Sequence, residues 1–178
     1  MLFNKIKKIF FKEKDNNKII KNILNNIIEI SYSISLNKKY NISDTFKAKY
    51  ETIILLIFLF YIRCKSDEKL KSKIQLIYDF LFEYIDYSLR EIGTGDLTVG
   101  KKIKKLARIF SIRLIEYEKA VKKDFKNIKP LIKKNIFKNK IGNSKFNFFY
   151  KSIYKAHKKI INANSNKVFV NNYINNIL

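Results

Sequence analysis

The side chains that most often carry catalysis or bind metals are scarce in this chain of 178 residues. Its one histidine, His157, lies in a lysine-rich region with no Cys, Asp or Glu downstream, so we expect a solvated side chain rather than a metal ligand or part of a catalytic triad. Its one cysteine, Cys64, cannot form an internal disulfide, and we expect a small buried residue in a reducing compartment. We therefore predict no catalytic residue, no metal and no cofactor, and a protein that is not an enzyme.

Two other patterns invite a chemical interpretation that their details do not support. Asp79, Glu83 and Asp86 repeat at helical spacing, but a di-metal site in a helical bundle also needs histidines, so we expect an exposed, salt-bridged face. Three of the four glycines lie within residues 93–100, but their spacings of two and five, without a preceding strand, do not match a nucleotide-binding loop. We predict no small-molecule substrate, and hence a binding or structural protein.

The elements that position these residues are predicted to be helices. Four glycines and one proline supply few turns, whereas 47% of the residues are hydrophobic and 15% aromatic. A chain of this length buries one core, so we predict an all-α fold with a single helical-bundle domain of long amphipathic helices and basic flanking segments. Residues 18–35 are predicted to form an amphipathic helix, the second in the chain, whose expected buried face is Ile19, Ile20, Ile23, Ile27, Ile30 and Ile34.

Capping residues and glycines place the later helices. Ser43 or Asp44 is expected to cap a largely apolar helix that ends near Lys65. A helix opening after Ser66 and Asp67 is predicted to bury Leu70, Ile74, Ile77, Leu81, Tyr84, Ser88 and Ile92. Gly93 suits the left-handed position after its end, and Asp96 suits the N-cap of the next helix, which has a basic stripe of Lys101, Lys104, Lys105 and Arg108. We expect Pro130 to interrupt the chain and a further helix around residues 144–162.

Charge is distributed unevenly and divides the chain into three parts. Of the net charge of +23, residues 44–124 carry +5, residues 1–43 carry +6, and residues 125–178 carry +12 because they contain 12 lysines and no acidic residue. We predict basic N-terminal helices over 1–43, a helical core over 44–125 and a basic, aromatic-rich C-terminal extension over 126–178. Lysine, isoleucine and asparagine have A/T-rich codons, so a nucleotide-biased genome is an alternative explanation of the lysine excess.

The N-terminus is predicted to form a short basic amphipathic helix. It either packs on the domain or contacts an anionic membrane surface, and the residues proposed for that contact are Leu2, Phe3, Lys5, Ile6, Lys8 and Phe10. The longest apolar run, residues 53–62, has ten residues, whereas a membrane-spanning helix needs about 20. We expect a soluble or peripheral protein.

Two motifs in the middle of the chain resemble a known family. Residues 89–99 (LREIGTGDLTV), followed by a lysine-rich helix with Phe110 and Tyr117, are similar to the signature of the ubiquinol–cytochrome c chaperone family. Asp44-Thr45, followed by Lys49-Tyr50-Glu51 and a long apolar run, is similar to a second segment of that family. Ala48 and Lys49 replace an expected Gly-Arg, Leu56 stands where many members have His, and Phe110-Ser111-Ile112-Arg113 lacks an expected glycine. The resemblance covers residues 40–122, and we find no counterpart for the chain beyond Pro130.

The resemblance implies an assembly chaperone for ubiquinol–cytochrome c reductase, complex III of the respiratory chain. Its implied client is nascent or newly inserted cytochrome b, and mitochondrial relatives work with a small partner protein near the ribosome. The implied location is cytoplasmic and peripheral at the inner face of the membrane, or the matrix side in mitochondria. The residues proposed for client or partner binding are Asp44, Thr45, Tyr50, Leu89, Arg90, Glu91, Gly93, Gly95, Asp96, Leu97 and Val99.

Two alternatives remain open on the residues alone. Arg90, Glu91 and Asp96 either form part of the client surface or only cap and brace the two helices around the glycine turn. Phe146, Phe148, Phe149 and Tyr150 lie among lysines, which is typical of an RNA-binding surface, but their helical spacing is also typical of a core face. A peripheral membrane protein with a purely structural role is a third interpretation of the chain.

Overall fold

The computed structural model describes residues 15–164 and residue 168, and this part of the chain folds into helices without a strand. The predicted all-α fold is thereby confirmed. The elements are α2 (Asp15–Leu36), α3 (Phe46–Lys65), α4 (Glu68–Glu91), α5 (Asp96–Val121), the short 3-10 helix η1 (Phe125–Ile128), α6 (Lys129–Asn135) and α7 (Asn143–Ile161). The proposed membrane-contact residues between Leu2 and Phe10 lie outside the described residues.

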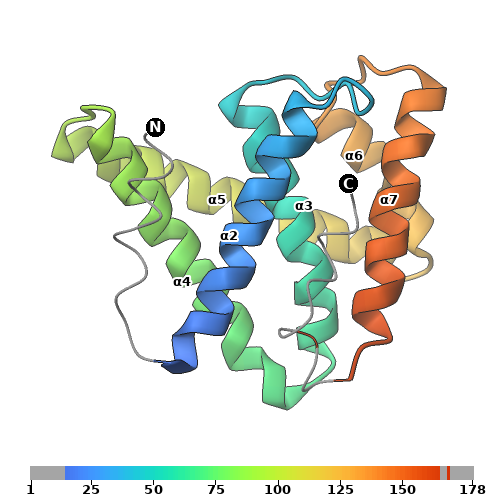
Figure 1. Cartoon of the computed structure of the whole chain (residues 1–178), viewed down its shortest axis with the longest axis horizontal. Coiled ribbons are helices and arrows are strands. Elements are labelled where there is room, and N and C mark those ends of the chain that lie inside the picture. The colour runs from blue at the N-terminus through green and yellow to red at the C-terminus, as the bar shows by residue number, and fades with distance from the viewer. Residues whose placement is uncertain (1–14, 165–167, 169–178) are drawn as a thin grey trace.

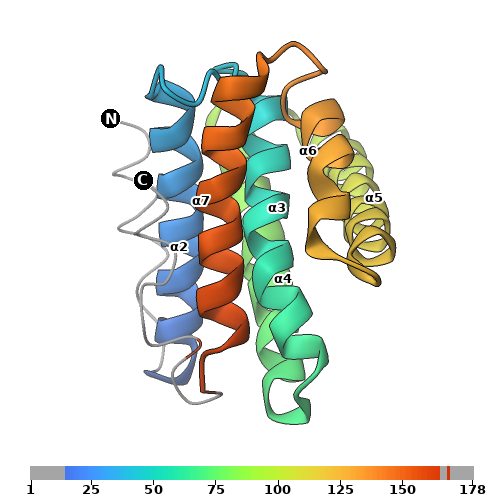
Figure 2. The same ribbon diagram turned by 90° about the vertical axis from the view of Figure 1, so that its right-hand side faces the viewer.

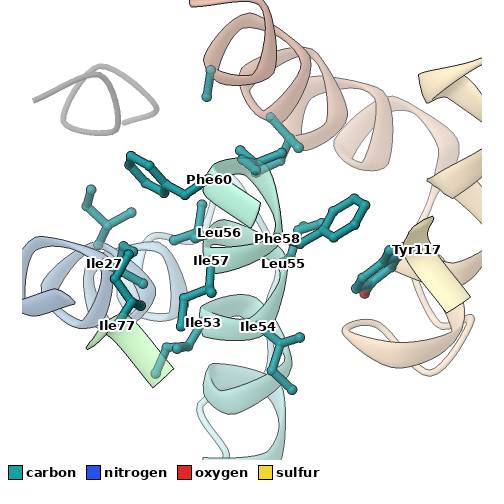
Figure 3. Packing of buried hydrophobic residues seen from close by; sticks show 14 of the residues in the cluster. Ile27, Ile53, Ile54, Leu55, Leu56, Ile57, Phe58, Phe60, Ile77 and Tyr117 are labelled. Atoms are coloured by element: carbon teal, nitrogen blue, oxygen red, sulfur yellow. The ribbon is translucent and has the colours of Figure 1, made fainter. Parts of the chain in front are cut away.

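Helix α3 is the centre of the bundle. Its apolar run surrounds the helix with hydrophobic side chains, and a helix that is apolar on every side is stable only when other elements cover it. Helices α2, α4, α5 and α7 all contact it (Figure 1). Figure 3 shows the consequence: Phe58 points towards Tyr117 of α5, while Ile27 of α2 and Ile77 of α4 lie on another side of α3. None of the described helices is long and apolar enough to cross a membrane.

Helices α2 and α4 bury one face each, largely as their periodicity predicts. Ile20, Ile27, Ile77 and Leu81 are fully or almost fully buried. Ile19 and Ile92 are exposed, and their predicted burial is wrong. Ile19 lies at the edge of the apolar face of α2, and Ile92 follows the last residue of α4, so helical spacing no longer fixes its direction.

The caps of two helices differ from the prediction. Thr45, rather than Ser43 or Asp44, caps α3, because its Oγ1 accepts a hydrogen bond of 3.3 Å from the Ala48 N–H. Pro130 lies in the first turn of α6, where the missing N–H has no helical partner to lose, so it opens a helix instead of interrupting one. The helix predicted around 144–162 is confirmed as α7.

Cys64 is fully buried near the end of α3. Burial raises the pKa of its thiol to about 12, so the thiol stays protonated at neutral pH. This environment confirms the predicted structural role.

Candidate functional site

The turn between α4 and α5 is a glycine-dependent helix end. Gly93 has φ of +80°, the left-handed conformation that disfavours residues with a side chain. Its N–H donates to the Arg90 carbonyl at 2.9 Å, and the Thr94 N–H donates to the Leu89 carbonyl at 3.1 Å. These two bonds satisfy carbonyls that the helix leaves free, in the arrangement of a Schellman cap. The predicted role of Gly93 is confirmed.

Two glycine-to-alanine changes should have opposite effects. Gly93→Ala should lower the free energy of unfolding by about 1 kcal/mol, because the left-handed backbone strains alanine although no atom lies within 4 Å of the added Cβ. Gly100→Ala, inside α5 and equally open, should raise it by about 0.5–1 kcal/mol. Urea denaturation of both variants checks this pair, and equal changes in the same direction would contradict it.

Arg90 joins the two helices across this turn. Its Nε donates to Asp86 at 2.7 Å, and its Nη1 donates to the Asp96 carboxylate. These hydrogen bonds, with Asp86 the larger contributor, raise the pKa of Arg90. Asp96 is the first residue of α5 and Gly95 is its N-cap, without a side-chain bond, so the predicted capping role of Asp96 is wrong. The carboxylate is held by Arg90 instead.

The same turn exposes large apolar side chains. We use the name hairpin tip for residues 89–99. Leu97 is 88% exposed and Ile92 is 65% exposed, whereas Val99 is buried and anchors the start of α5. The hairpin tip therefore presents two apolar side chains beside the Arg90–Asp96 ion pair and the exposed Glu91.

The second motif lies at the corner between α2 and α3. The Lys49 ammonium lies 2.5 Å from the Asp44 carboxylate, and Ser35 Oγ donates to the same carboxylate at 3.5 Å. The hydrogen bond and charge of Lys49 lower the pKa of Asp44. Lys49, which replaces the arginine expected from the family resemblance, also lies 4.2 Å above the Tyr32 ring. Thus Lys49 still pairs with the aspartate of the motif.

Two buried polar contacts connect α3 with α5. Tyr50 Oη donates to the Leu106 carbonyl at 2.9 Å, and burial raises the pKa of Tyr50. Glu51 is 1% exposed and accepts from Arg113, with Nε–Oε2 at 2.9 Å and Nη2–Oε1 at 3.1 Å. Burial opposes the charge of Arg113, but the hydrogen bonds and charges of Glu51 and Glu116 outweigh burial and raise its pKa.

The pairing of Glu51 with Arg113 was not predicted. Both residues stand in the motifs that carry the family resemblance, but 62 positions separate them. A carboxylate at the start of an apolar helix is a signal that a cation must lie opposite it, because an unpaired buried charge is strongly unfavourable. The chain offers only four arginines, yet the sequence alone does not say which one faces Glu51.

The predicted site residues thus fall into two groups. Asp44, Thr45 and Tyr50 lie at or just below the α2–α3 corner, and residues 89–99 lie at the far end of the α4–α5 hairpin (Figure 1). Within the described part of the chain, the contacts of Tyr50 and Glu51 with α5 link these groups. The carboxylates predicted to form a salt-bridged face do so in part: Asp86 pairs with Arg90, and Asp79 accepts from Gln75.

The C-terminal aromatic residues are mostly core. Phe146 and Phe149 of α7 are buried, while Phe148 is 47% exposed. Lys133 lies 4.7 Å from the centre of the Phe146 ring, and Lys129 lies 4.5 Å from that of Tyr150. The core interpretation is therefore confirmed for Phe146 and Phe149.

His157 does not have the predicted solvated side chain. Its ring is half-buried and stacks on Phe125 of η1, with 3.8 Å between the ring centres. Burial, followed by the charge of Lys158, lowers the pKa of His157 to about 4. It lies four residues after the buried Ile153, so helical spacing turns it towards the core.

Acid should destabilise the protein partly through His157. The folded state keeps it neutral down to a pKa of about 4, whereas the unfolded chain takes up the proton near pH 6.5. Its stabilising contribution is thus complete above pH 6.5 and is lost as the pH falls towards 4. When the pH falls from about 6.5 to 4.5, the free energy of unfolding of the wild type should decrease by about 1 kcal/mol more than that of His157→Phe. This value already allows for the partial solvent exposure of the ring, which weakens the effect. Urea denaturation at both pH values measures this, and parallel losses would contradict it.

Comparisons with known proteins identify the family of this chain and a solved structure with a similar fold. The family model described as Ubiquinol-cytochrome C chaperone matches residues 38–161. The crystal structure of the Cbp3 homolog from Brucella abortus is similar at 25% sequence identity, covering 88% of this chain and 90% of that chain with a TM-score of 0.66. A search of curated proteins gave no significant match. The family match extends past Pro130 into α7, so the expectation that this region has no counterpart is wrong.

Proposed function

Since this chain belongs to the ubiquinol-cytochrome C chaperone family, we propose that it assists the assembly of complex III by binding newly made cytochrome b. The observation that carries this proposal is the family match over residues 38–161, which includes both motifs and the helices that connect them. Binding and release of a client need shape and exposed surface rather than a catalytic group, so the chain works in this proposal as a non-enzymatic assembly factor.

The hairpin tip is the first part of the proposed client surface. A newly made membrane protein offers apolar segments, and large exposed apolar side chains are what a soluble surface can use to bind them. Ile92 and Leu97 meet this requirement, because both are more than half exposed: Ile92 lies in the capped turn, and Leu97 lies in the first turn of α5. Arg90 and Asp96 hold the turn in shape, while Glu91 supplies a charge at its rim.

The α2–α3 corner is the second part of the proposed surface. Phe46 and Leu36 are 59% and 70% exposed there, next to the Asp44–Lys49 ion pair and the capping Thr45. Tyr50 and Glu51 act below this surface in our proposal: by bonding to α5 they fix the corner relative to the α4–α5 hairpin. A client segment that contacts both groups then meets a surface of fixed geometry.

The proposed location and further partners of the chain follow from the same client. A chaperone for cytochrome b works at the inner face of the membrane, or at the matrix side in mitochondria, where the client is inserted. A small assembly partner and the ribosome are the further partners that we propose, on the basis of the family resemblance. The alternative is a structural membrane protein that binds no client. The variant described next distinguishes this alternative from a chaperone.

The double variant Arg90→Ala/Glu91→Ala tests the client surface. The Arg90 ion pairs are exposed and screened by solvent, so their loss should change the free energy of unfolding little. Complex III assembly in cells should nevertheless fall several-fold, because the hairpin tip loses its bracing and its rim charge. Spectroscopic cytochrome b content and native-gel analysis of complex III provide the readout.

A matched control lies at the other end of the same helix. Glu68→Ala/Lys71→Ala removes an exposed ion pair from the start of α4 and should change neither stability nor assembly appreciably. If both double variants reduce assembly equally, or if the hairpin variant loses assembly only in proportion to its thermal stability, the residues brace the fold and the binding role is rejected.

A further inference from the structure

The outer face of α5 combines positive charge with aliphatic side chains. We define this face as the exposed residues at helical spacing on the side of α5 opposite its buried Phe110 and Tyr117. They are Lys101, Lys104, Lys105, Arg108, Ile112, Ile115 and Lys119. Ile115 is 52% exposed and Ile112 is 40% exposed. In Figure 2, α5 forms one edge of the bundle.

The acidic residues of α5 do not share this face. Asp96, its first residue, pairs with Arg90 of α4. Glu116 pairs with Arg113, whose guanidinium points towards the buried Glu51. Glu118 pairs with Lys65 and accepts from Tyr61 Oη at 2.9 Å, both on α3. The hydrogen bond from Lys65 lowers the pKa of Glu118, so this carboxylate is ionised and engaged towards the bundle.

This separation of charges is not a result of composition alone. Residues 44–124 contain 12 acidic residues against 17 basic ones, yet the outer face of α5 carries five cations and no carboxylate. A face of this kind is complementary to an anionic surface. It is also not covered by another helix of the described part of the chain, because its residues are exposed there.

The aliphatic residues of this face favour one of two anionic surfaces, RNA or a lipid bilayer. Single-stranded RNA is usually held by aromatic side chains that stack on bases beside the cations, and the outer face of α5 has no aromatic residue. A bilayer offers both anionic headgroups for lysine and arginine and an acyl boundary into which isoleucine inserts. Ile112 and Ile115 therefore favour lipid over nucleic acid.

We propose that the outer face of α5 binds the surface of a membrane that contains anionic lipids. The helix has 26 residues, about 39 Å in length, so its cations spread along the membrane plane instead of meeting at one point. The hairpin tip lies at the N-terminal end of the same helix, and a chain docked in this way holds Leu97 close to the bilayer. The inference rests on the surface of α5 and stands independently of the proposed client.

Vesicle binding by the purified full-length chain tests the proposal. Wild-type protein should sediment with vesicles of phosphatidylcholine and phosphatidylglycerol, but not with phosphatidylcholine alone, and binding should weaken as salt is raised. Lys101→Glu/Lys104→Glu/Arg108→Glu should reduce partitioning roughly 100-fold, because each cation near an anionic surface contributes about fivefold. Ile112→Ser/Ile115→Ser should reduce it about tenfold by removing apolar insertion.

The matched control changes the net charge by the same amount on another helix. Lys145→Glu/Lys151→Glu/Lys155→Glu reverses three exposed lysines of α7, and should bind vesicles within about threefold of the wild type. Circular dichroism establishes that each variant is folded. A second control, deletion of residues 1–12, should leave most of the binding in place.

Several results would overturn the proposal. They are an absence of vesicle binding by the wild type, equal losses in the α5 and α7 variants, or complete loss on deletion of residues 1–12. Binding of the wild type to an RNA homopolymer through the α5 cations, without vesicle binding, would assign the face to nucleic acid instead. None of these results depends on whether the chain binds cytochrome b.

Discussion

Arg113→Met lowers the free energy of unfolding by about 3 kcal/mol, because it leaves the Glu51 carboxylate buried without a counter-charge. Glu51 is 1% exposed. The Arg113 guanidinium donates to its carboxylate in three contacts of 2.9 to 3.1 Å. Removing one partner of a buried ion pair typically costs about 3–5 kcal/mol, and the partial exposure of Arg113 places the expectation at the lower end. Denaturant unfolding monitored by circular dichroism measures the change.

A double-mutant cycle separates the pair from the packing of Arg113 itself. Glu51→Met/Arg113→Met replaces both charges with apolar side chains of similar length and should recover stability to within about 1 kcal/mol of the wild type. Arg113→Lys should be intermediate, because an ammonium cannot form the paired contacts of the guanidinium. If the double variant is as unstable as the sum of the single variants, Glu51 and Arg113 are not coupled.

Phe58→Ala should destabilise the fold by about 3–5 kcal/mol. Phe58 is fully buried on α3 and its ring lies 5.2 Å from that of Tyr117, so truncation opens a cavity between α3 and α5 (Figure 3). Thermal unfolding should show the loss as a large decrease in the midpoint temperature.

The same substitution near the start of α3 provides the control. Phe46 is 59% exposed, and Phe46→Ala should change stability by less than about 1 kcal/mol. Under the proposed function, Phe46→Ala should still reduce complex III assembly, since this ring belongs to the α2–α3 corner. Equal destabilisation by the two variants would contradict the placement of Phe58 in the core and of Phe46 at the surface.

The helices were predictable from local signals in the sequence. The isoleucine spacing of α2, the apolar run of α3 and the glycine after α4 each determine local structure through burial or backbone freedom. Caps were less predictable, because Ser43, Asp44 and Thr45 are adjacent and all can accept from a free amide. In the structure Thr45 caps α3, whereas Asp44 pairs with Lys49.

The candidate site depends on contacts between distant residues, which periodicity does not reveal. Glu51 and Arg113 could be recognised as unusual residues but not as partners, since that requires the packing of α3 against α5. Likewise, helical spacing was consistent with a buried Phe149 but left a binding surface open, and it did not reveal that the ring of His157 stacks on Phe125 of η1. Leu97 is exposed because helical spacing places it on the same side of α5 as Lys101 and Lys104, whereas Val99 lies on the buried side.

The most direct test of the proposed function is in-cell crosslinking from the hairpin tip. A photo-crosslinking residue at Leu97, with Lys155 on α7 as the matched exposed control, should capture cytochrome b from Leu97 and not from Lys155, and cells without the protein should contain less complex III. Normal complex III in such cells, or equal recovery of cytochrome b from both positions, would contradict the proposal that this surface receives the client.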